Sequence, residues 1–404
     1  MQNELLALEK KHCIGWREYR IGDLFEKLDL KRLKEGIFDK QNEISKIRNE
    51  EFDLPLVNAK NGDNGIMYYA RSSDYESAEM TLDIVGDGAV STGNVYPQPE
   101  RTGVLYNAYL VKPKWEIVTK NQLLFMAPTV EKSIKLKFGY ENKAGWEKVK
   151  FEKITLPTAN NEIAFDYIEE FIATLDAERL ATLDAYLTTT NLKDYTLTSE
   201  EAQALADIDK VEWGEFKIGE LFEIKPTKNY GLTNQKLFET KGETPVVSNT
   251  SINNGITGYI GLEPTEKGNM IIFSDTTTDE GIFYQPNDFV GYSHVQGMHP
   301  KVEHSFEKFD YLYIATAFKK AVRGKYNYGT KMNRESIAKE KIQLPIKSAH
   351  TPDYAFMTTY IKAMQKVVIK NVVEWADKRI AKTKEAVEKS TRHCEPFPLR
   401  HCEP

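Results

Sequence analysis

The chain has 404 residues and a formal net charge of −6 at pH 7, with 41% hydrophobic and 28% charged residues. This composition is ordinary for a globular protein, and the length suffices for two buried cores. No apolar run reaches about 18 residues, and the polar start lacks a signal-peptide pattern, so we expect a cytoplasmic protein without a membrane partner. The negative net charge excludes an overall basic footprint, so any surface for nucleic acid must be local.

One segment near the start of the chain occurs twice. Residues 16–26 return at residues 213–223 with conservative changes, such as Arg for Lys and Tyr for Phe. Each copy is followed by an Asn-Gly pair, at Asn64-Gly65 and Asn254-Gly255, and then by a closing K-I-x-L-P motif at residues 153–157 and 341–345. The sequence therefore predicts two copies of one unit. Each unit is expected to be of α/β (α+β) class, because short strand-like runs alternate with helical ones.

Taken in order, the chain begins with a helical lead-in over residues 1–15 and continues with strand-like runs such as residues 80–85 and 103–106. Helical runs follow at residues 122–126 and 131–137. The predicted organisation is a first globular unit over residues 1–157, a central helical spacer over 158–211, a second globular unit over 212–346, a distal spacer helix over 347–391 and a disordered tail over 392–404.

Both long helical stretches carry an apolar stripe. In the first stretch the stripe contains Ile168, Ile172 and Leu175. In the second, the four-three spacing of a coiled coil is kept by Met357, Ile361, Met364, Val368, Asn371 or Val372, and Trp375. A long helix must bury such a stripe, so we predict that the two helices pack antiparallel as a coiled-coil spacer between the units. The alternative is that each stripe packs only into the core of its own unit.

The duplicated opening W-x-E-[YF]-[RK]-I-G-[DE]-L-F, the closing motif and the long helix after each closing resemble the specificity subunit of a type I restriction-modification system. Residues 291–301 are also similar to a run in the second recognition domains of that family. The resemblance covers residues 14–390. It implies that each unit is a target recognition domain and that the chain reads a bipartite, asymmetric site on double-stranded DNA.

The same resemblance implies a subunit that performs no catalysis. In that family the helices set the gap between the half-sites and dock methyltransferase subunits, which recruit the restriction and translocase subunit. S-adenosylmethionine, ATP and Mg are expected on those partner subunits, and no cofactor is expected on this chain. A close alternative is the specificity subunit of a related system that cuts on both sides of its site.

Polar loops and basic bands supply the candidate DNA contacts. Asn can bridge adenine, Thr offers a hydroxyl and a methyl group, and Lys and Arg bind phosphates. The candidates in the first unit are Asn58, Lys60, Asn61, Asn64, Ser91, Thr92, Asn94, Lys135 and Lys137. Those in the second unit are Ser248, Asn249, Thr250, Asn253, Asn254, Thr276, Thr277, Lys319, Lys320, Arg323, Lys325, Tyr328, Lys331 and Arg334. Such loops are also what ordinary turns look like, and a charge run is usually a solvated face.

Motifs for catalysis and metal binding are absent from the sequence. There is no phosphate-binding G-x-x-x-x-G-K-[ST], H-E-x-x-H, paired C-x-x-C, G-x-S-x-G or Asn-Pro-Pro-Tyr motif. His294, His299 and His304 recur every five residues, which does not place them on one helical face. We therefore expect neither catalytic residues nor a metal site. The rival interpretations are an enzyme that itself cuts or modifies DNA and an adaptor whose two domains bind glycan or protein rather than DNA.

Overall fold

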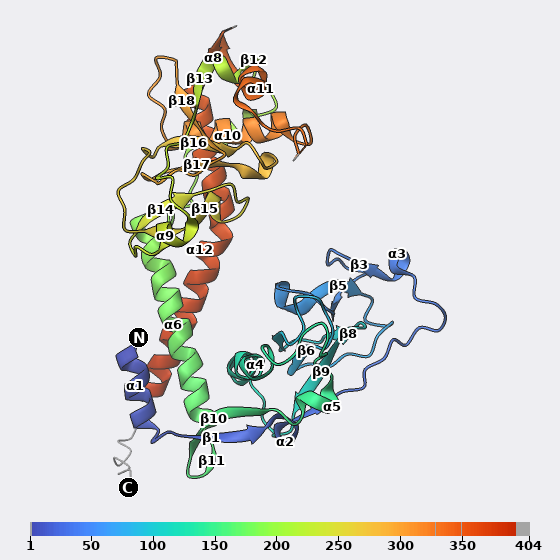
Figure 1. Cartoon of the computed structure of the whole chain (residues 1–404). Helices are drawn as coiled ribbons and strands as arrows, with labels where there is room; N and C mark the ends of the chain where they lie inside the picture. The colour runs from blue at the N-terminus through green and yellow to red at the C-terminus, as the bar shows by residue number, and fades with distance from the viewer. Residues whose placement is uncertain (1, 328, 349, 393–404) are drawn as a thin grey trace. The chain divides into compact units, whose positions relative to one another are not determined.

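In each half of the computed structural model (Figure 1), the repeated opening segment pairs with the closing segment. The structure describes residues 2–327, 329–348 and 350–392. Strand β1 (Gly15–Arg20) is antiparallel to β10 (Lys153–Ala159), with Trp16 opposite Pro157. Strand β12 (Trp213–Lys217) is antiparallel to β19 (Lys341–Ser348), with Trp213 opposite Pro345. The two motifs of each repeat thus form one small sheet.

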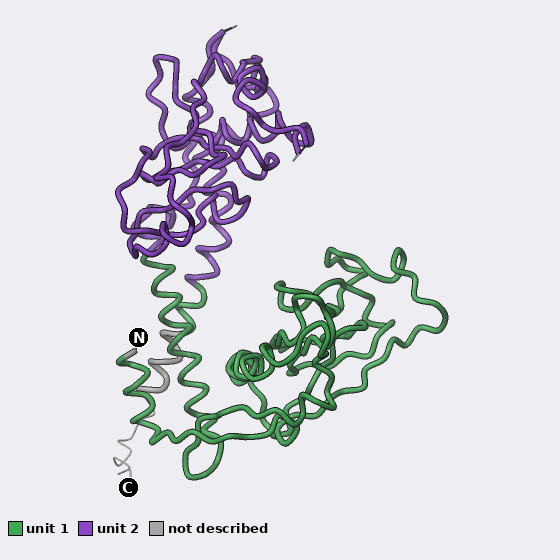
Figure 2. The backbone as a smooth tube through the Cα atoms, in the orientation of Figure 1, with its two compact units in different colours: residues 1–185, 378–404 green, residues 186–377 purple. Residues whose placement is uncertain are grey.

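The chain divides into two compact units (Figure 2). Unit 1 comprises residues 1–185 and 378–404, and unit 2 comprises residues 186–377. The boundaries of the units fall inside both long helices, between residues 185 and 186 and between residues 377 and 378. The finer domain boundaries expected from the sequence stay a prediction. The expected disordered tail, residues 392–404, lies outside the described residues from position 393 onward, as does Tyr328.

Unit 1 contains three sheets, ordered β1-β10-β11, β2-β9-β6-β7 and β3-β5-β4-β8. Its other elements are α1 (Gln2–Lys11), α2 (Ile21–Leu24), β2 (Phe25–Lys27), α3 (Lys40–Glu43), β3 (Ile44–Ser45), β4 (Leu54–Val57), η1 (Asp63–Gly65), β5 (Ile66–Ala70), β6 (Thr81–Val85), β7 (Val95–Gln98), β8 (Gly103–Val104), β9 (Ala108–Pro113), α4 (Lys120–Ile134), α5 (Trp146–Val149), β11 (Glu162–Ile163) and α6 (Phe165–Thr189).

Unit 2 repeats this plan with sheets β12-β19-β20, β13-β18-β16-β17 and β14-β15. Its other elements are α7 (Ser199–Asp207), α8 (Ile218–Leu221), β13 (Phe222–Pro226), α9 (Asn234–Phe238), β14 (Thr244–Val247), η2 (Asn253–Gly255), β15 (Ile256–Ile260), β16 (Met270–Ser274), η3 (Asp279–Gly281), β17 (Ile282–Gln285), β18 (Val295–Pro300), α10 (Lys308–Val322), α11 (Arg334–Lys339), β20 (Thr351–Pro352) and α12 (Tyr354–Arg392). Within the described residues, no helix combines the length and the hydropathy that a membrane span requires.

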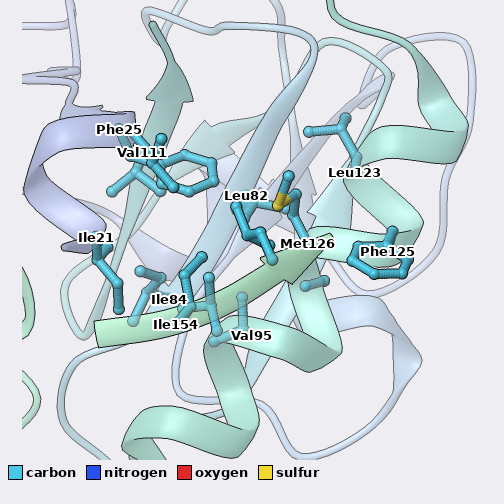
Figure 3. Packing of buried hydrophobic residues seen from close by; sticks show 14 of the residues in the cluster. Ile21, Phe25, Leu82, Ile84, Val95, Val111, Leu123, Phe125, Met126 and Ile154 are labelled. Carbon is cyan, nitrogen blue, oxygen red and sulfur yellow. The ribbon is translucent and has the colours of Figure 1, made fainter. Parts of the chain in front are cut away.

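Each unit has its own apolar core between a four-stranded sheet and one helix. In unit 1, side chains of β6 and β9 pack against Leu123 and Met126 of α4 (Figure 3). Helix α4 begins at a capping box made by Thr119 and Gln122, which satisfies backbone donors that the first turn leaves without partners. In unit 2, β16 and α10 pack in the same way, with Phe273 and Phe318 in edge-to-face contact. The two cores repeat one design.

The long helices start in the cores of the units. Ile168 of α6 is fully buried in the core of unit 1, and Ile172 packs against it, whereas Leu175 is only half-buried. Met357 of α12 is fully buried in the core of unit 2, where Ile361 packs against it. Near the other end of α12, Arg379 forms an ion pair of 2.5 Å with Asp176 of α6 within unit 1.

The predicted seam of α12 is wrong in its second half. Met364 is half-buried, but Val368 and Trp375 are 69% and 50% exposed. The buried positions there are instead Val373 and Ala376, each 1% exposed. An α-helix has 3.6 residues per turn, so a strict four-three pattern rotates away from a fixed buried face along a long straight helix.

The buried acid Asp83 lies in the middle of β6. It is fully buried, and neither carboxylate oxygen has a hydrogen-bond partner among the described residues. Burial raises the pKa of Asp83 well above its ordinary value. The position that corresponds in unit 2, by the pairing of β16 with β18, holds Ile272. At this position unit 1 therefore buries a carboxyl group where unit 2 has an apolar side chain.

We expect Asp83→Asn to change how the stability of unit 1 depends on pH. Because the folded-state pKa of Asp83 is raised, its protonated form favours folding below the ordinary carboxyl pKa of about 4, and this contribution is lost as pH rises toward the folded-state value. The variant cannot ionise, so its free energy of unfolding at pH 8 should exceed that of the wild type by about 1–3 kcal/mol. Urea unfolding at pH 5 and pH 8 measures the difference, and an equal difference at both pH values would contradict the account.

Candidate nucleic-acid interface

The Asn-Gly turn of unit 2 is fixed to the edge strand β17. Asn254 and Gly255 have φ angles of 53° and 77°, in the left-handed region that Asn and Gly tolerate best. The side-chain amide Nδ2 of Asn254 donates to the carbonyl oxygen of Tyr284 at 3.0 Å, and Nε2 of Gln285 donates to the carbonyl oxygen of Asn254 at 2.7 Å. Asn254 thus holds the turn in place with the amide that was predicted to contact DNA.

The loop before this turn lies beside a second polar loop. Nδ2 of Asn249 donates to Oγ1 of Thr276 at 3.3 Å, and Asn249 is otherwise exposed. Ser248 is buried and hydrogen-bonded to Thr257. Thr250 and Thr277 are half-buried, and Asn253 is exposed with its Nδ2 donating to the carbonyl oxygen of Ile256 at 3.0 Å. The two loops therefore present exposed amides and hydroxyls side by side.

The end of helix α10 reaches the same place. Nζ of Lys319 lies 5.1 Å from the centroid of the Phe283 ring on β17, and a β-carbon at Gly255 would lie 3.2 Å from that ring. Arg323 has an 84% exposed side chain whose Nε lies 3.9 Å from Oδ2 of Asp279. Residues 248–254, residues 275–281, Lys319 and Arg323 thus meet at β17, and we call them the unit 2 loop surface.

The remaining cations of the basic band do not all belong to this surface. Lys320 lines a cavity of about 740 Å³ together with Trp213 and Tyr360. Lys325 forms an ion pair of 2.7 Å with Glu340, which also accepts a hydrogen bond from Tyr326. Burial and the Glu340 carboxylate raise the pKa of Tyr326 to about 12. The cations of the basic band therefore lie in different environments. The remaining two, Lys331 and Arg334, are exposed.

Unit 1 brings the corresponding parts together, but with different residues. Nζ of Lys135, at the end of α4, donates to the carbonyl oxygens of Val90 and Thr92 at 2.9 and 3.1 Å and also bonds to Oδ1 of Asn94. Nδ2 of Asn94 donates to Oδ1 of Asn61 at 3.0 Å. In unit 1, too, two polar loops and the end of a helix lie together. Lys135 connects them through its hydrogen bonds.

Several other candidates of unit 1 hold the loops in shape. Asn64 repeats the role of Asn254, since its φ is 51° and its Nδ2 donates to the carbonyl oxygen of Pro97 at 2.9 Å. Asn58 accepts a hydrogen bond of 3.0 Å from the backbone N–H of Asn107. Ser91 and Thr92 are each 3% exposed. Buried groups with these bonds shape the surface, so any direct contact with nucleic acid would be made by more exposed neighbours.

Two lysines of the basic bands have matching partners in the two units. Lys137 pairs with Glu152, as Lys325 pairs with Glu340. Lys60 pairs with Asp63 at 3.0 Å, and both side chains lie at the exposed turn of unit 1. An acidic partner neutralises each of these cations in the free protein, so a phosphate would have to compete with that partner.

Sequence reasoning missed the apolar side chains of these surfaces. Ile252 at the tip of the 248–254 loop and Val90 in the loop before β7 are each 73% exposed. Phe283, which lies under Lys319, was also missed. The one available signal was the position of Ile252 between Ser251 and Asn253, where no apolar alternation explains it.

The recurrent histidines serve separate contacts. Nδ1 of His294 lies 2.9 Å from Oδ1 of Asp275, and Nε2 of His304 lies 3.2 Å from Oδ2 of Asp310. Within the described ranges, no group of three or more His, Cys, Asp or Glu side chains could hold a metal ion.

A family model described as type I restriction modification DNA specificity domain matches residues 210–374. The protein named Type II restriction enzyme BgcI specificity subunit S.BcgI, from Heyndrickxia coagulans, is 24% identical over 366 residues, which cover 90% of this chain and 98% of the relative.

A solved structure shows the same fold. It is the S subunit of a type I restriction-modification system from M. genitalium, with a TM-score of 0.52 and 16% sequence identity, covering 93% of this chain and 95% of that one. The expected fold class is thereby confirmed: two similar domains of mixed helix and sheet, with two long helices, α6 and α12.

Proposed function

We propose that this chain is a DNA specificity subunit of a restriction-modification system, in which unit 1 and unit 2 each read one half of a bipartite, asymmetric site. The subunit recognises DNA and is itself non-catalytic. The observation that supports the division of labour is the repeated meeting of two polar loops and a helix end at the same sheet edge in each unit.

In unit 2 the chemistry of the loop surface suits duplex DNA. Asn249 and Thr250 can hydrogen-bond to base edges in the major groove, where each base pair shows a distinct pattern of donors and acceptors. Lys319 and Arg323 lie at the border of these loops, where phosphate contacts would fix the register of the protein on the duplex. Specificity and affinity thus come from different residues of one surface.

The two units should read different sequences. The Asn-Gly turns of the two units occupy equivalent positions, but the residues before them differ. Unit 1 has Lys60, Asn61 and Gly62 where unit 2 has Thr250, Ser251 and Ile252. Under the turn, Tyr96 of unit 1 is replaced by Phe283 of unit 2. Different side chains at equivalent positions present different donors, acceptors and apolar groups, so an asymmetric site follows.

The helices are the proposed docking place for methyltransferase subunits. Helix α12 exposes Val367, Val368, Val372 and Trp375, by 47%, 69%, 40% and 50%, and a partner helix could cover such a stripe. A restriction and translocase subunit would join through those subunits. S-adenosylmethionine, ATP and Mg would be bound by the partners, and the complex would work in the cytoplasm, where the DNA is.

A second candidate differs in the kind of restriction system. The relative from Heyndrickxia coagulans is named as part of a type II restriction enzyme, so this chain could serve a related system that cuts on both sides of its site. The DNA-reading role is the same in both cases.

Mapping modified bases in cells with and without this gene tests the proposed function. We expect methylation at one bipartite motif that disappears when the gene is deleted and returns with a plasmid copy. If the motif is unchanged by the deletion, and purified full-length chain binds no sequence in a random DNA pool, the adaptor interpretation replaces this one.

A further inference from the structure

We propose that Ile252 is a specificity-determining residue that contacts the 5-methyl group of a thymine in the half-site read by unit 2. The proposal rests on the proposed function and deepens it, because it names one side chain and the chemical group that it reads. Ile252 lies at the tip of the 248–254 loop, and its side chain is 73% exposed. Single exposed apolar residues are common on proteins, so its setting must carry the inference.

The first part of that setting is a rigid backbone. The N–H of Ile252 donates to Oγ1 of Thr250 at 3.4 Å, and its carbonyl oxygen accepts from the N–H of Gly255 at 3.0 Å. The next turn is clamped to β17 by Asn254 and Gln285. The loop tip therefore holds this side chain outward in one place, which lowers the entropy lost when it meets a partner.

The second part is the surface to which Ile252 belongs. It belongs to the unit 2 loop surface, which also contains the exposed Asn249 and the cations Lys319 and Arg323. Cations that bind phosphates would bring the loop tip to the groove, where base edges are exposed. In the major groove, thymine is the base that offers an apolar group, its 5-methyl. An isoleucine among polar readers matches that group.

The third part is the difference between the units. Counting back from the matched turns Asn64-Gly65 and Asn254-Gly255, the position of Ile252 in unit 1 is Gly62. Gly62 has a φ of 86°, and its N–H donates to the Tyr96 hydroxyl at 2.9 Å. Unit 1 has no side chain at this position, so the methyl contact would belong to one half-site only.

Duplexes in which single thymines are replaced by deoxyuridine test the proposal, because uracil lacks only the 5-methyl group. The full-length chain is titrated with the bipartite duplex that it selects from a random pool. At one thymine or more in the unit 2 half-site, the substitution should weaken wild-type binding by about fourfold, the value of one buried methyl group. Ile252→Ser should lose a similar factor on the thymine duplex and show no further loss on the uracil duplex.

Ile117→Ser is the matched control. Ile117 is 76% exposed and lies in the segment before α4, at the opposite end of that helix from Lys135. This variant should keep the fourfold difference, and both variants should unfold at the wild-type urea midpoint. The proposal is overturned if no uracil substitution weakens the wild type, or if Ile252→Ser still distinguishes the two duplexes. A wild-type chain that selects no duplex would instead refute the proposed function.

Discussion

Replacing Lys319 and Arg323 together with alanine is expected to weaken binding to DNA of every sequence by about 10- to 30-fold at 0.15 M salt. Both side chains lie on the unit 2 loop surface, and Arg323 is 84% exposed. Because each lost phosphate contact lowers the dependence of log affinity on log salt by about 0.9, the slope should fall by about 2. The preferred sequence should not change, since phosphates carry no base identity. Titration of labelled duplex at several salt concentrations measures all three quantities.

Lys308→Ala with Lys320→Ala is the matched control for this pair. It removes the same charge from the same helix α10, but Lys308 is at the other end and Lys320 lines a separate cavity. We expect less than about a twofold change for this variant. Equal losses in the two pairs would mean that only net charge matters, and the loop surface would then not be the place of contact.

Replacing Phe222 with alanine is expected to remove recognition of one half-site while leaving the other. Phe222 is 1% exposed and packs against Phe306 and Tyr311 at centroid distances of 5.3 and 6.5 Å. Removing a buried phenyl ring costs about 3–5 kcal/mol, which is a large part of the stability of a domain of this size. Urea unfolding should show an early transition for unit 2 and a retained one for unit 1.

Phe25→Ala is the mirror experiment in unit 1. Phe25 is fully buried and lies at the same place in the repeat, with its ring 5.5 Å from that of Trp115. Each variant should lose base preference in one block of the selected sequence, and the two blocks should differ. If either substitution abolishes preference in both blocks, the two cores are not independent and the division of labour is wrong.

The duplicated architecture could be predicted from the sequence because both copies keep the residues that the backbone conformation requires. Gly22 and Gly219 show this: a β-carbon there would lie 2.9 and 2.8 Å from the carbonyl oxygens of Lys150 and Ala338. The Asn-Gly pairs are likewise held at positive φ. The pairing of each opening strand with its closing strand was not predicted, because the partners of a strand far along the chain cannot be read from local pattern.

The candidate sites were found as segments but not as individual contacts. The polar loops and part of each basic band do lie at one edge of each unit. However, the side chains of Asn64, Asn254 and Lys135 form their hydrogen bonds within the protein. The residue type determines which hydrogen bonds a side chain can form. The fold determines which groups lie close enough to be its partners. The same limit hid Ile252, since an exposed isoleucine and a buried one look alike in a sequence.

The seam of α12 shows a different limit. The periodicity of apolar residues predicts that a helix has a buried face, but a small error in the assumed period accumulates over many turns. For this reason Val368 and Trp375 were predicted to lie in the seam but are exposed. Asp83 was missed because its burial in β6 breaks the usual rule that acids lie outside.

Selection of binding sites from a random duplex pool by the full-length chain, followed by sequencing, tests the central claim most directly. Two units that each read their own half-site predict two different short blocks separated by a gap of constant length and no base preference. A single continuous block, or one block repeated in both halves, would contradict the claim.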